Sequence, residues 1–284
     1  MARIADALAD AQARGLERLD AQLLLLHAIG IDPAGLGAQR AWLIAHDRDA
    51  LAADASQRFG QHLVRRLDGE PLAYITGHKE FFGLDLRVDA RVLVPRPDTE
   101  TLVDWTLELL PQPGAEDPLG LRILDLGTGS GAVALALKHS RPDAQLHALD
   151  AFPEALSVAT ANAVRLGLQV HFIHSDWLAQ VDGRYHCIVA NPPYIAGCDP
   201  HLAALRHEPL QALAAGPQGL DDIRRIVLQA RAHLHPGGWL LLEHGFEQAP
   251  AVRALLGAAG YRSIASRCDL AGHARCTGAQ RGPD

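Results

Sequence analysis

From residue 122 to near the C-terminus, short apolar segments alternate with longer segments that repeat apolar residues at helical spacing. The short segments predict strands and the longer ones predict helices. The predicted strands are 122–126, 145–149, 169–173, 186–190, 239–243, 262–265 and roughly 275–278, and the main predicted helices are 133–139, 153–166, 221–235 and 247–259. Strands that are each followed by a helix lie parallel in one sheet with helices on both faces. The sequence therefore predicts an α/β protein with a doubly wound, mostly parallel, seven-stranded Rossmann-like sheet.

The first part of the chain has a different pattern, in which apolar residues repeat at helical spacing without intervening strands. The repeats are Ile4 and Leu8; Leu19, Leu23 and Leu26; and Phe59, Leu63 and Leu67. Residues 1–70 are therefore predicted to form a small N-terminal helical domain, with helix ends at Gly30 and Gly69. Residues 71–95 are predicted to be a β-hairpin linker, and residues 96–284 are predicted to form the domain that carries the sheet.

Within the linker, residues 84–88 alternate like a half-buried strand, and residues 91–94 are the predicted hairpin partner. The segment Asp98-Thr99-Glu100 precedes a predicted helix. Asp98 or Thr99 suits the role of helix N-cap, and a place at the mouth of an active site is an equal alternative. Residues 111–120 are rich in proline, glycine and acidic residues, which predicts a surface linker.

The charge and residue usage exclude several classes of protein. Lys and Arg number 26 against 33 Asp and Glu, a formal net charge of −7, so direct binding of nucleic acid is not expected. No apolar run is long enough to span a bilayer, and the N-terminus lacks a signal-peptide core, so a cytoplasmic protein with no membrane contact is expected. The sequence has no C-x-x-C and no H-E-x-x-H, so the cysteines are expected to be free, buried thiols and no metal site is predicted. A monomer is expected.

A glycine-rich loop follows the first strand of the sheet. It reads Gly127-Thr128-Gly129-Ser130-Gly131, and glycines at such a turn let a ligand approach the backbone closely. Asp150 ends the next strand, where a carboxylate can accept hydrogen bonds from both ribose hydroxyls of a nucleoside cofactor. Gly127, Gly129 and Ala132 also satisfy the G-x-G-x-x-A dinucleotide fingerprint, so a nicotinamide-dependent oxidoreductase is an alternative.

The tetrapeptide Asn191-Pro192-Pro193-Tyr194 follows the fourth strand of the sheet. Two successive prolines make the backbone stiff and hold Asn191 in an extended conformation. The asparagine amide and the backbone carbonyls can then accept hydrogen bonds from a planar NH2 group, and Tyr194 offers a flat face for stacking. The structural alternative is a strand end followed by a Pro-Pro turn.

These segments are predicted to meet at one edge of the sheet. In a doubly wound sheet the ligand crevice lies at the carboxyl ends of strands one and four, which are followed by the glycine loop and by Asn191. Ser175-Asp176-Trp177 follows strand three at the same edge. Trp177 is placed to flank an adenine, although a core tryptophan is the alternative. The tetrapeptide has no role in hydride transfer, which weighs against the oxidoreductase.

With these motifs, the sequence resembles the PrmC/HemK family, the glutamine N5-methyltransferases of class 1 peptide chain release factors, over nearly its whole length. The motifs that carry the resemblance are Tyr74-Ile75-Thr76-Gly77, Pro95-Arg96-Pro97-Asp98-Thr99-Glu100, the loop 125–131, Ser175-Asp176-Trp177, Asn191-Pro192-Pro193-Tyr194, His207-Glu208-Pro209 and Leu241-Leu242-Glu243-His244-Gly245. The Asn-Pro-Pro-Tyr motif alone is shared with adenine-N6 methyltransferases of DNA and RNA, which remain an alternative. The ribosomal-protein glutamine methyltransferases are another alternative, but they differ after Pro95-Arg96. Residues 269–278 are irregular and depart from the family pattern.

The resemblance implies an S-adenosylmethionine-dependent protein-(glutamine-N5) methyltransferase that acts on the Gly-Gly-Gln glutamine of a release factor and so modulates translation termination. The cofactor would contact Gly127, Thr128, Gly129, Ser130, Gly131, Asp150, Trp177 and Asn191. The substrate would contact Asn191, Pro192, Pro193 and Tyr194, of which Asn191, Pro192 and Tyr194 would be catalytic. The helical domain would grip the protein substrate.

Overall fold

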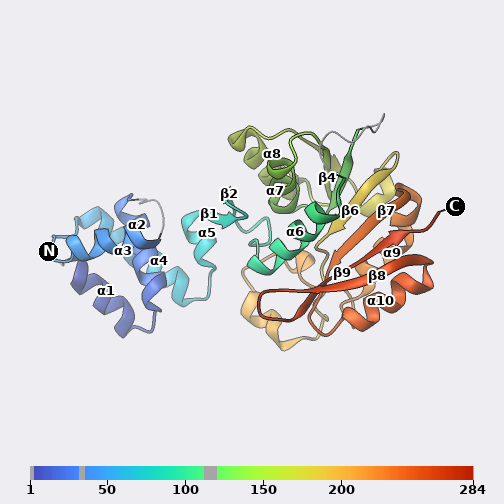
Figure 1. Cartoon of the computed structure of the whole chain (residues 1–284). Helices are drawn as coiled ribbons and strands as arrows, with labels where there is room; N and C mark the ends of the chain where they lie inside the picture. The colour runs from blue at the N-terminus through green and yellow to red at the C-terminus, as the bar shows by residue number, and fades with distance from the viewer. Residues whose placement is uncertain (1–2, 32–35, 112–119, 284) are drawn as a thin grey trace. The chain divides into compact units, whose positions relative to one another are not determined.

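The computed structural model describes residues 3–31, 36–111 and 120–283, and the chain divides into two compact units, Met1–His78 and Lys79–Asp284 (Figure 1). Most of the predicted surface linker, residues 112–119, lies outside the described residues. In the part of the chain that is described, no helix is both long enough and apolar enough to cross a membrane.

The first unit is a group of helices, as predicted. They are α1 (Ile4–Ala13), α2 (Arg18–Ile29), α3 (Leu36–Ala45), α4 (Ala53–Leu67) and α5 (Leu72–Thr76). Apolar side chains of α2 and α4, among them Leu24, Leu25 and Leu63, are almost fully buried in one core. Ile75 of α5 belongs to the same core, so this short helix, which the sequence pattern did not predict, is part of the first unit.

The hairpin has a different partner from the predicted one. Strand β1 (His78–Phe81) pairs with β2 (Leu84–Arg87), so the predicted pairing with residues 91–94 is wrong. The two residues of the turn, Phe82 and Gly83, have φ of 51° and 76°, and such turns suit the twist of a two-residue hairpin. Phenylalanine is an unusual residue at this position, so residues 82–83 lack the usual signature of a hairpin turn. Residues 91–94 instead form part of a loop.

The second unit contains the predicted sheet. Its strands are β3 (Arg122–Leu126), β4 (Gln145–Asp150), β5 (Val170–His174), β6 (Tyr185–Ala190), β7 (Leu234–Glu243), β8 (Tyr261–Cys268) and β9 (Ala274–Arg281). Their order is β5-β4-β3-β6-β7-β9-β8, and only β9 runs antiparallel to its neighbours. The predicted seven-stranded, mostly parallel, doubly wound sheet is confirmed. The strand order reverses between β3 and β6, which places a ligand crevice at their carboxyl ends.

Helices cover both faces of the sheet (Figure 1). They are α6 (Glu100–Leu109), α7 (Ala132–Ser140), α8 (Pro153–Leu166), α9 (Asp221–Ala230) and α10 (Ala249–Ala258). Alternate residues of each strand enter opposite cores: Ile123 and Val189 pack in the core that includes α6 and α7, whereas Leu124 and Ile188 pack in the core that includes α9 and α10. Burial on both faces explains why the strands are continuously apolar.

Helix α9 is shorter than predicted. The pattern predicted a helix over 221–235, but α9 ends at Ala230, a short 3-10 turn follows, and β7 begins at Leu234 opposite Tyr185. A Cβ on Gly238 would lie 3.1 Å from the Tyr185 carbonyl oxygen, so the backbones of β6 and β7 approach closely here. Pairing with β6 therefore overrides the helical pattern at these last residues.

The irregular tail forms an ordered turn between β8 and β9. The Asp269 carboxylate accepts the backbone N–H groups of Ala271 and His273, both at 2.9 Å. Of the four cysteines, all free, Cys187 and Cys276 are buried, but Cys198 and Cys268 are exposed, so the expectation of buried thiols holds for only two of them. Cys198 lies in a loop, and Cys268 ends the edge strand β8, so neither thiol is covered by the core.

Candidate active site

A cavity of about 280 Å³ opens at the carboxyl edge of the sheet, where β3 and β6 end. Of the predicted cofactor residues, Gly127, Thr128, Gly129, Ser130, Asp150, Trp177 and Asn191 line it. Of the predicted substrate residues, Asn191 and Pro193 line it, whereas Pro192 is buried and Tyr194 is half-buried behind it. The parallel topology thus brings together segments that are far apart in the sequence.

The glycine loop wraps around open space in this cavity. Gly129 has a φ of 54°, and a Cβ built there would have no atom within 4 Å outside its chain neighbours. Gly131 has a φ of 85°, and a Cβ there would lie 3.0 Å from Leu135 Cδ1, so this position closes the loop onto α7. The Thr128 hydroxyl donates to Asp125 Oδ2 at 2.7 Å, and burial raises the pKa of Asp125 to about 7. The loop is a rigid cradle with an accessible backbone.

Asp150, at the end of β4, lines the cavity and hydrogen-bonds the glycine loop. Its Oδ2 accepts the Gly129 N–H at 2.9 Å and its Oδ1 accepts the Phe152 N–H at 3.0 Å. Burial raises the pKa of Asp150, and these backbone hydrogen bonds oppose the shift. Each carboxylate oxygen can accept a further hydrogen bond, so Asp150 can still bind ligand hydroxyls at the cavity surface.

Trp177 lies beside the glycine loop. A Cβ on Gly127 would be 3.5 Å from the Trp177 ring, and the indole Nε1–H donates to Asp222 Oδ1 at 3.0 Å. Trp177 also packs against the core that contains α9, in agreement with the structural alternative, while it lines the cavity. Asp222, which also lines the cavity, was not predicted, because no sequence pattern indicates that α9 begins next to Trp177.

Asn191 is held by a hydrogen bond from its own amide nitrogen. Nδ2 donates to Thr99 Oγ1 at 3.2 Å, which turns the amide oxygen away from Thr99. Thr99 is buried with 4% exposure and lines the same cavity. This contact ties the side-chain amide of Asn191 to a residue that precedes it by a long stretch of chain.

The segment Asp98-Thr99-Glu100 does not cap the helix that follows. A short 3-10 turn (Pro97–Thr99) leads into α6, and no side-chain cap hydrogen bond is present, so the capping prediction is wrong. Each residue instead binds another segment: Asp98 pairs with Arg275 at 3.1 Å, Thr99 with Asn191, and Glu100 accepts the Phe82 N–H at 3.1 Å. The 3-10 turn keeps these side chains outside the capping geometry.

A buried glutamate joins the two loops around the cavity mouth. Glu208, 7% exposed, forms an ion pair with Arg96 and accepts the Val94 N–H at 3.1 Å. Pro95 and Pro209, which flank these contacts, line the cavity. Glu208 therefore joins the segment 207–209 to the segment 95–100, two of the segments that resemble the family motifs.

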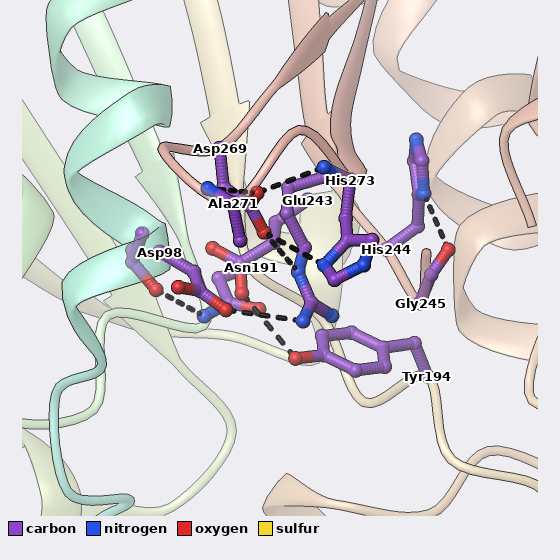
Figure 2. Close-up of polar contacts among 11 residues, drawn as sticks. Asp98, Asn191, Tyr194, Glu243, His244, Gly245, Asp269, Ala271 and His273 are labelled. Atoms are coloured by element: carbon purple, nitrogen blue, oxygen red, sulfur yellow. Dashed lines mark hydrogen bonds and ion pairs between the residues drawn. The ribbon is translucent and has the colours of Figure 1, made fainter. Parts of the chain in front are cut away.

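A second buried glutamate lies behind Asn191 (Figure 2). The Tyr194 hydroxyl donates to Glu243 Oε1 at 3.4 Å, while Oε2 of Glu243 has no hydrogen-bond partner in the described chain. Glu243 is 1% exposed, and burial raises its pKa to about 7, a shift that the Thr99 hydroxyl and Arg275 oppose. Burial also raises the pKa of Tyr194. The sequence signal for Glu243 is a charged residue at the end of the apolar strand 239–243, and no role was predicted for it.

Comparison with known proteins gives a consistent picture along the chain. The family model described as the PrmC N-terminal domain matches residues 1–77, and the methyltransferase small domain model matches residues 103–216. The chain is 46% identical over 267 residues to the release factor glutamine methyltransferase of Coxiella burnetii, covering 93% of this chain and 92% of that protein. It is 42% identical over 276 residues to the Escherichia coli protein of the same name, covering 96% of this chain and 95% of that protein.

Solved structures support the fold alone. A methyltransferase from Pyrococcus furiosus matches with a TM-score of 0.55 and 19% identity, over 79% of this chain and all of that chain (100%). The Thermus thermophilus 16S rRNA N2 G1207 methyltransferase, solved with AdoMet and guanosine, matches with a TM-score of 0.52 and 21% identity, over 72% of this chain and 49% of that chain.

Proposed function

The chain belongs to the family of release factor glutamine methyltransferases, and on this premise we propose that it methylates the side-chain amide nitrogen of the Gly-Gly-Gln glutamine in a class 1 release factor. The methyl donor is S-adenosylmethionine. The observation that carries the proposal is the position of Asn191, whose oriented amide lines the same cavity as the glycine loop.

The residues around the cavity fit the cofactor. The accessible backbone at Gly129 suits its amino acid portion, Asp150 suits the ribose hydroxyls, and the Trp177 ring suits the adenine face. When bound, S-adenosylmethionine supplies an electrophilic methyl group on a positively charged sulfur. We assign Gly127, Thr128, Ser130 and Gly131 to the same binding loop.

The protein's role in the reaction is to position a poor nucleophile. We propose that Asn191 Oδ1 and the Pro192 carbonyl accept the two N–H bonds of the substrate amide, with Pro193 and Tyr194 holding this stiff segment in place. Transfer of the methyl group to the amide nitrogen would leave the electron pair of the carbon–sulfur bond on the cofactor's sulfur, and one nitrogen proton would pass to water. The two acceptors favour the positive charge that develops on nitrogen. Alignment of this kind contributes roughly 7–11 kcal/mol.

Mass spectrometry of a purified release factor after incubation with the protein and S-adenosylmethionine tests the proposal. The expected result is a gain of one CH2 unit on the Gly-Gly-Gln glutamine. Parallel incubations with adenine-containing DNA, rRNA and ribosomal protein test the other methyltransferase classes, and NADH binding tests the oxidoreductase. Modification of one of these substrates in place of the release factor would overturn the proposal. We also propose that the enzyme is a monomer, that it acts in the cytoplasm and that it does not bind nucleic acid directly.

Asp150→Ala is expected to weaken S-adenosylmethionine binding by about 1–3 kcal/mol, because a charged acceptor for the ribose hydroxyls is lost. Isothermal calorimetry measures this change directly. Asp269→Ala is the matched control, because Asp269 is also 7% exposed and also accepts two backbone N–H groups, but lies outside the cavity lining. Equal affinity of the wild type and Asp150→Ala would remove Asp150 from the cofactor site.

The helical unit is proposed to bind the protein substrate. A variant lacking residues 1–77 is expected to bind S-adenosylmethionine normally and to methylate intact release factor at least tenfold more slowly. A tenfold loss corresponds to about 1.4 kcal/mol of binding free energy, which a modest docking interface would supply. The cut follows α5, because Ile75 belongs to the first core and would be stranded by a cut at residue 70.

A short Gly-Gly-Gln peptide is the control substrate for this truncation. Both proteins should methylate the peptide at similar rates, since the short peptide lacks the parts of the release factor that the helical unit is proposed to bind. Full activity of the truncated protein on the intact factor would show that the helical unit does not bind the substrate.

A further inference from the structure

The first turns of α9 hold the two residues that follow Ser175 at the cavity. Asp222 Oδ1 accepts the Trp177 indole N–H at 3.0 Å. The Arg225 guanidinium donates to both carboxylate oxygens of Asp176, at 2.9 and 2.6 Å. Residues three apart lie on the same face of a helix, so one face of α9 binds two successive residues of this loop. All four of these residues line the cavity.

The backbone that carries the Trp177 ring has a strained conformation. Trp177 has a φ of 48°, in the left-handed region that bulky residues rarely adopt. Such a conformation persists only where the surrounding contacts enforce it. Ser175, 2% exposed, supplies these contacts: its hydroxyl donates to the Trp177 carbonyl at 2.6 Å and accepts the Gln180 N–H at 3.0 Å. The starting point of the side chain is therefore fixed at the edge of the cavity.

The orientation of the ring depends on contacts at its two ends. The indole Nε1–H can only donate a hydrogen bond, and the Asp222 carboxylate is its acceptor. At the other end of the ring, Cζ3 and Cη2 lie 3.5 and 3.6 Å from the place that a Cβ on Gly127 would occupy. The contact with Gly127 is apolar and has no direction, so the hydrogen bond to Asp222 is the contact that selects the rotamer of Trp177.

We propose that Asp222 is a positioning residue for the cofactor: its carboxylate holds the Trp177 indole in the orientation that packs against the adenine of S-adenosylmethionine. The inference rests on the proposed function, in which Trp177 contacts the adenine face. Asp222 acts through Trp177. Because the ring is already ordered in the free protein, cofactor binding does not have to order a large side chain.

Cofactor affinity tests this role. Asp222→Ala is expected to weaken S-adenosylmethionine binding about three- to tenfold, the cost of ordering one large side chain on binding. Asp222→Asn keeps an acceptor oxygen and should retain most of the affinity. Asp221→Ala is the matched control: Asp221 is an acid in the same first turn of α9, but it pairs with Arg224 at 2.8 Å and lies outside the cavity lining. This control should bind the cofactor normally in calorimetry.

Two further comparisons separate the hydrogen bond from the charge of Asp222. S-Adenosylhomocysteine lacks the positive charge on sulfur, and Asp222→Ala should weaken its binding by the same factor, because the affected contact is with adenine. In a Trp177→Phe background, which has no indole N–H, Asp222→Ala should cause no further loss. Equal losses in Asp222→Asn and Asp222→Ala, or a further loss in the Trp177→Phe background, would overturn the proposal.

A measurement on the cofactor-free protein tests the hydrogen bond itself. The chain has four tryptophans, so 15N labelling of indole gives four side-chain signals, and the one that is absent in Trp177→Phe belongs to Trp177. Asp222→Ala should shift this signal upfield and speed its exchange with water, whereas Asp221→Ala should leave it unchanged. Trp105, 3% exposed in the other core of the sheet, is the internal control.

The two kinds of failure are distinguishable, because these measurements need neither the protein substrate nor turnover. A Trp177 signal that is the same in the wild type and Asp222→Ala would overturn the inference, and so would normal cofactor affinity in Asp222→Ala. A protein that binds S-adenosylmethionine but does not methylate a release factor would instead contradict the proposed function.

Discussion

Asn191→Ala is expected to slow single-turnover methylation by roughly 5- to 150-fold, equivalent to about 1–3 kcal/mol at the transition state. The substitution removes the side-chain oxygen that accepts one N–H of the substrate amide, while the Pro192 carbonyl remains. It also removes the Nδ2 donor to Thr99, so the loss lies toward the upper end of this range. Quenched-flow methylation of a release factor with pre-bound cofactor measures the rate.

Two further variants show whether this loss is chemical. Asn191→Asp keeps an acceptor oxygen and should retain more activity than Asn191→Ala. Asn162→Ala is the structural contrast, because Asn162 is fully buried and its amide joins Arg87 to the Ser130 carbonyl. Its loss of rate should follow its loss of thermal stability, whereas Asn191→Ala should melt near the wild type. A folded Asn191→Ala protein with normal turnover would exclude Asn191 from catalysis.

The sequence was sufficient to predict the positions of the glycine loop, Asp150, Trp177 and Asn191 at one edge of the sheet. Each follows a short apolar strand, and parallel topology brings successive carboxyl ends together whatever the lengths of the connections. The prediction therefore needed only the strand ends, which are marked by glycine, proline and charged residues. Exact side-chain partners were beyond this reasoning.

The contact between Asn191 and Thr99 was not predictable, because the two residues lie far apart in the chain. Local chemistry favoured Asp98 or Thr99 as a helix cap, since these residue types satisfy free N–H groups at helix starts. Tertiary contacts took both side chains instead, toward Arg275 and Asn191. Helix-cap preferences consider only residues that are close in the sequence, so they cannot predict partners from distant segments.

Gly219→Ala is expected to lower the free energy of unfolding by about 2–5 kcal/mol and to slow methylation at least tenfold, since left-handed strain adds to overpacking. Gly219 has a φ of 67°, and a Cβ there would lie 2.1 Å from the Tyr194 carbonyl oxygen. The obstacle is backbone, so no side-chain rotation relieves it. Gln248 also donates to that carbonyl at 3.0 Å and fixes it in place. The segment that begins at Asn191 must therefore move. Chemical denaturation and single-turnover assays measure the two effects.

Gly167→Ala is the control that separates the cost of the left-handed backbone from the cost of the steric clash with Tyr194. Gly167 ends α8 with the same φ of 67°, but a Cβ there meets no atom within 4 Å, so only the left-handed strain of about 1–2 kcal/mol is expected and the rate should not change. Cofactor affinity should be close to normal in both variants, because Gly219 and Gly167 lie outside the cavity lining. Equal stability and equal turnover in the two variants would contradict the proposed coupling. A larger loss in Gly219→Ala would show that the loop before α9 sets the position of the Tyr194 backbone, and through it the geometry of Asn191.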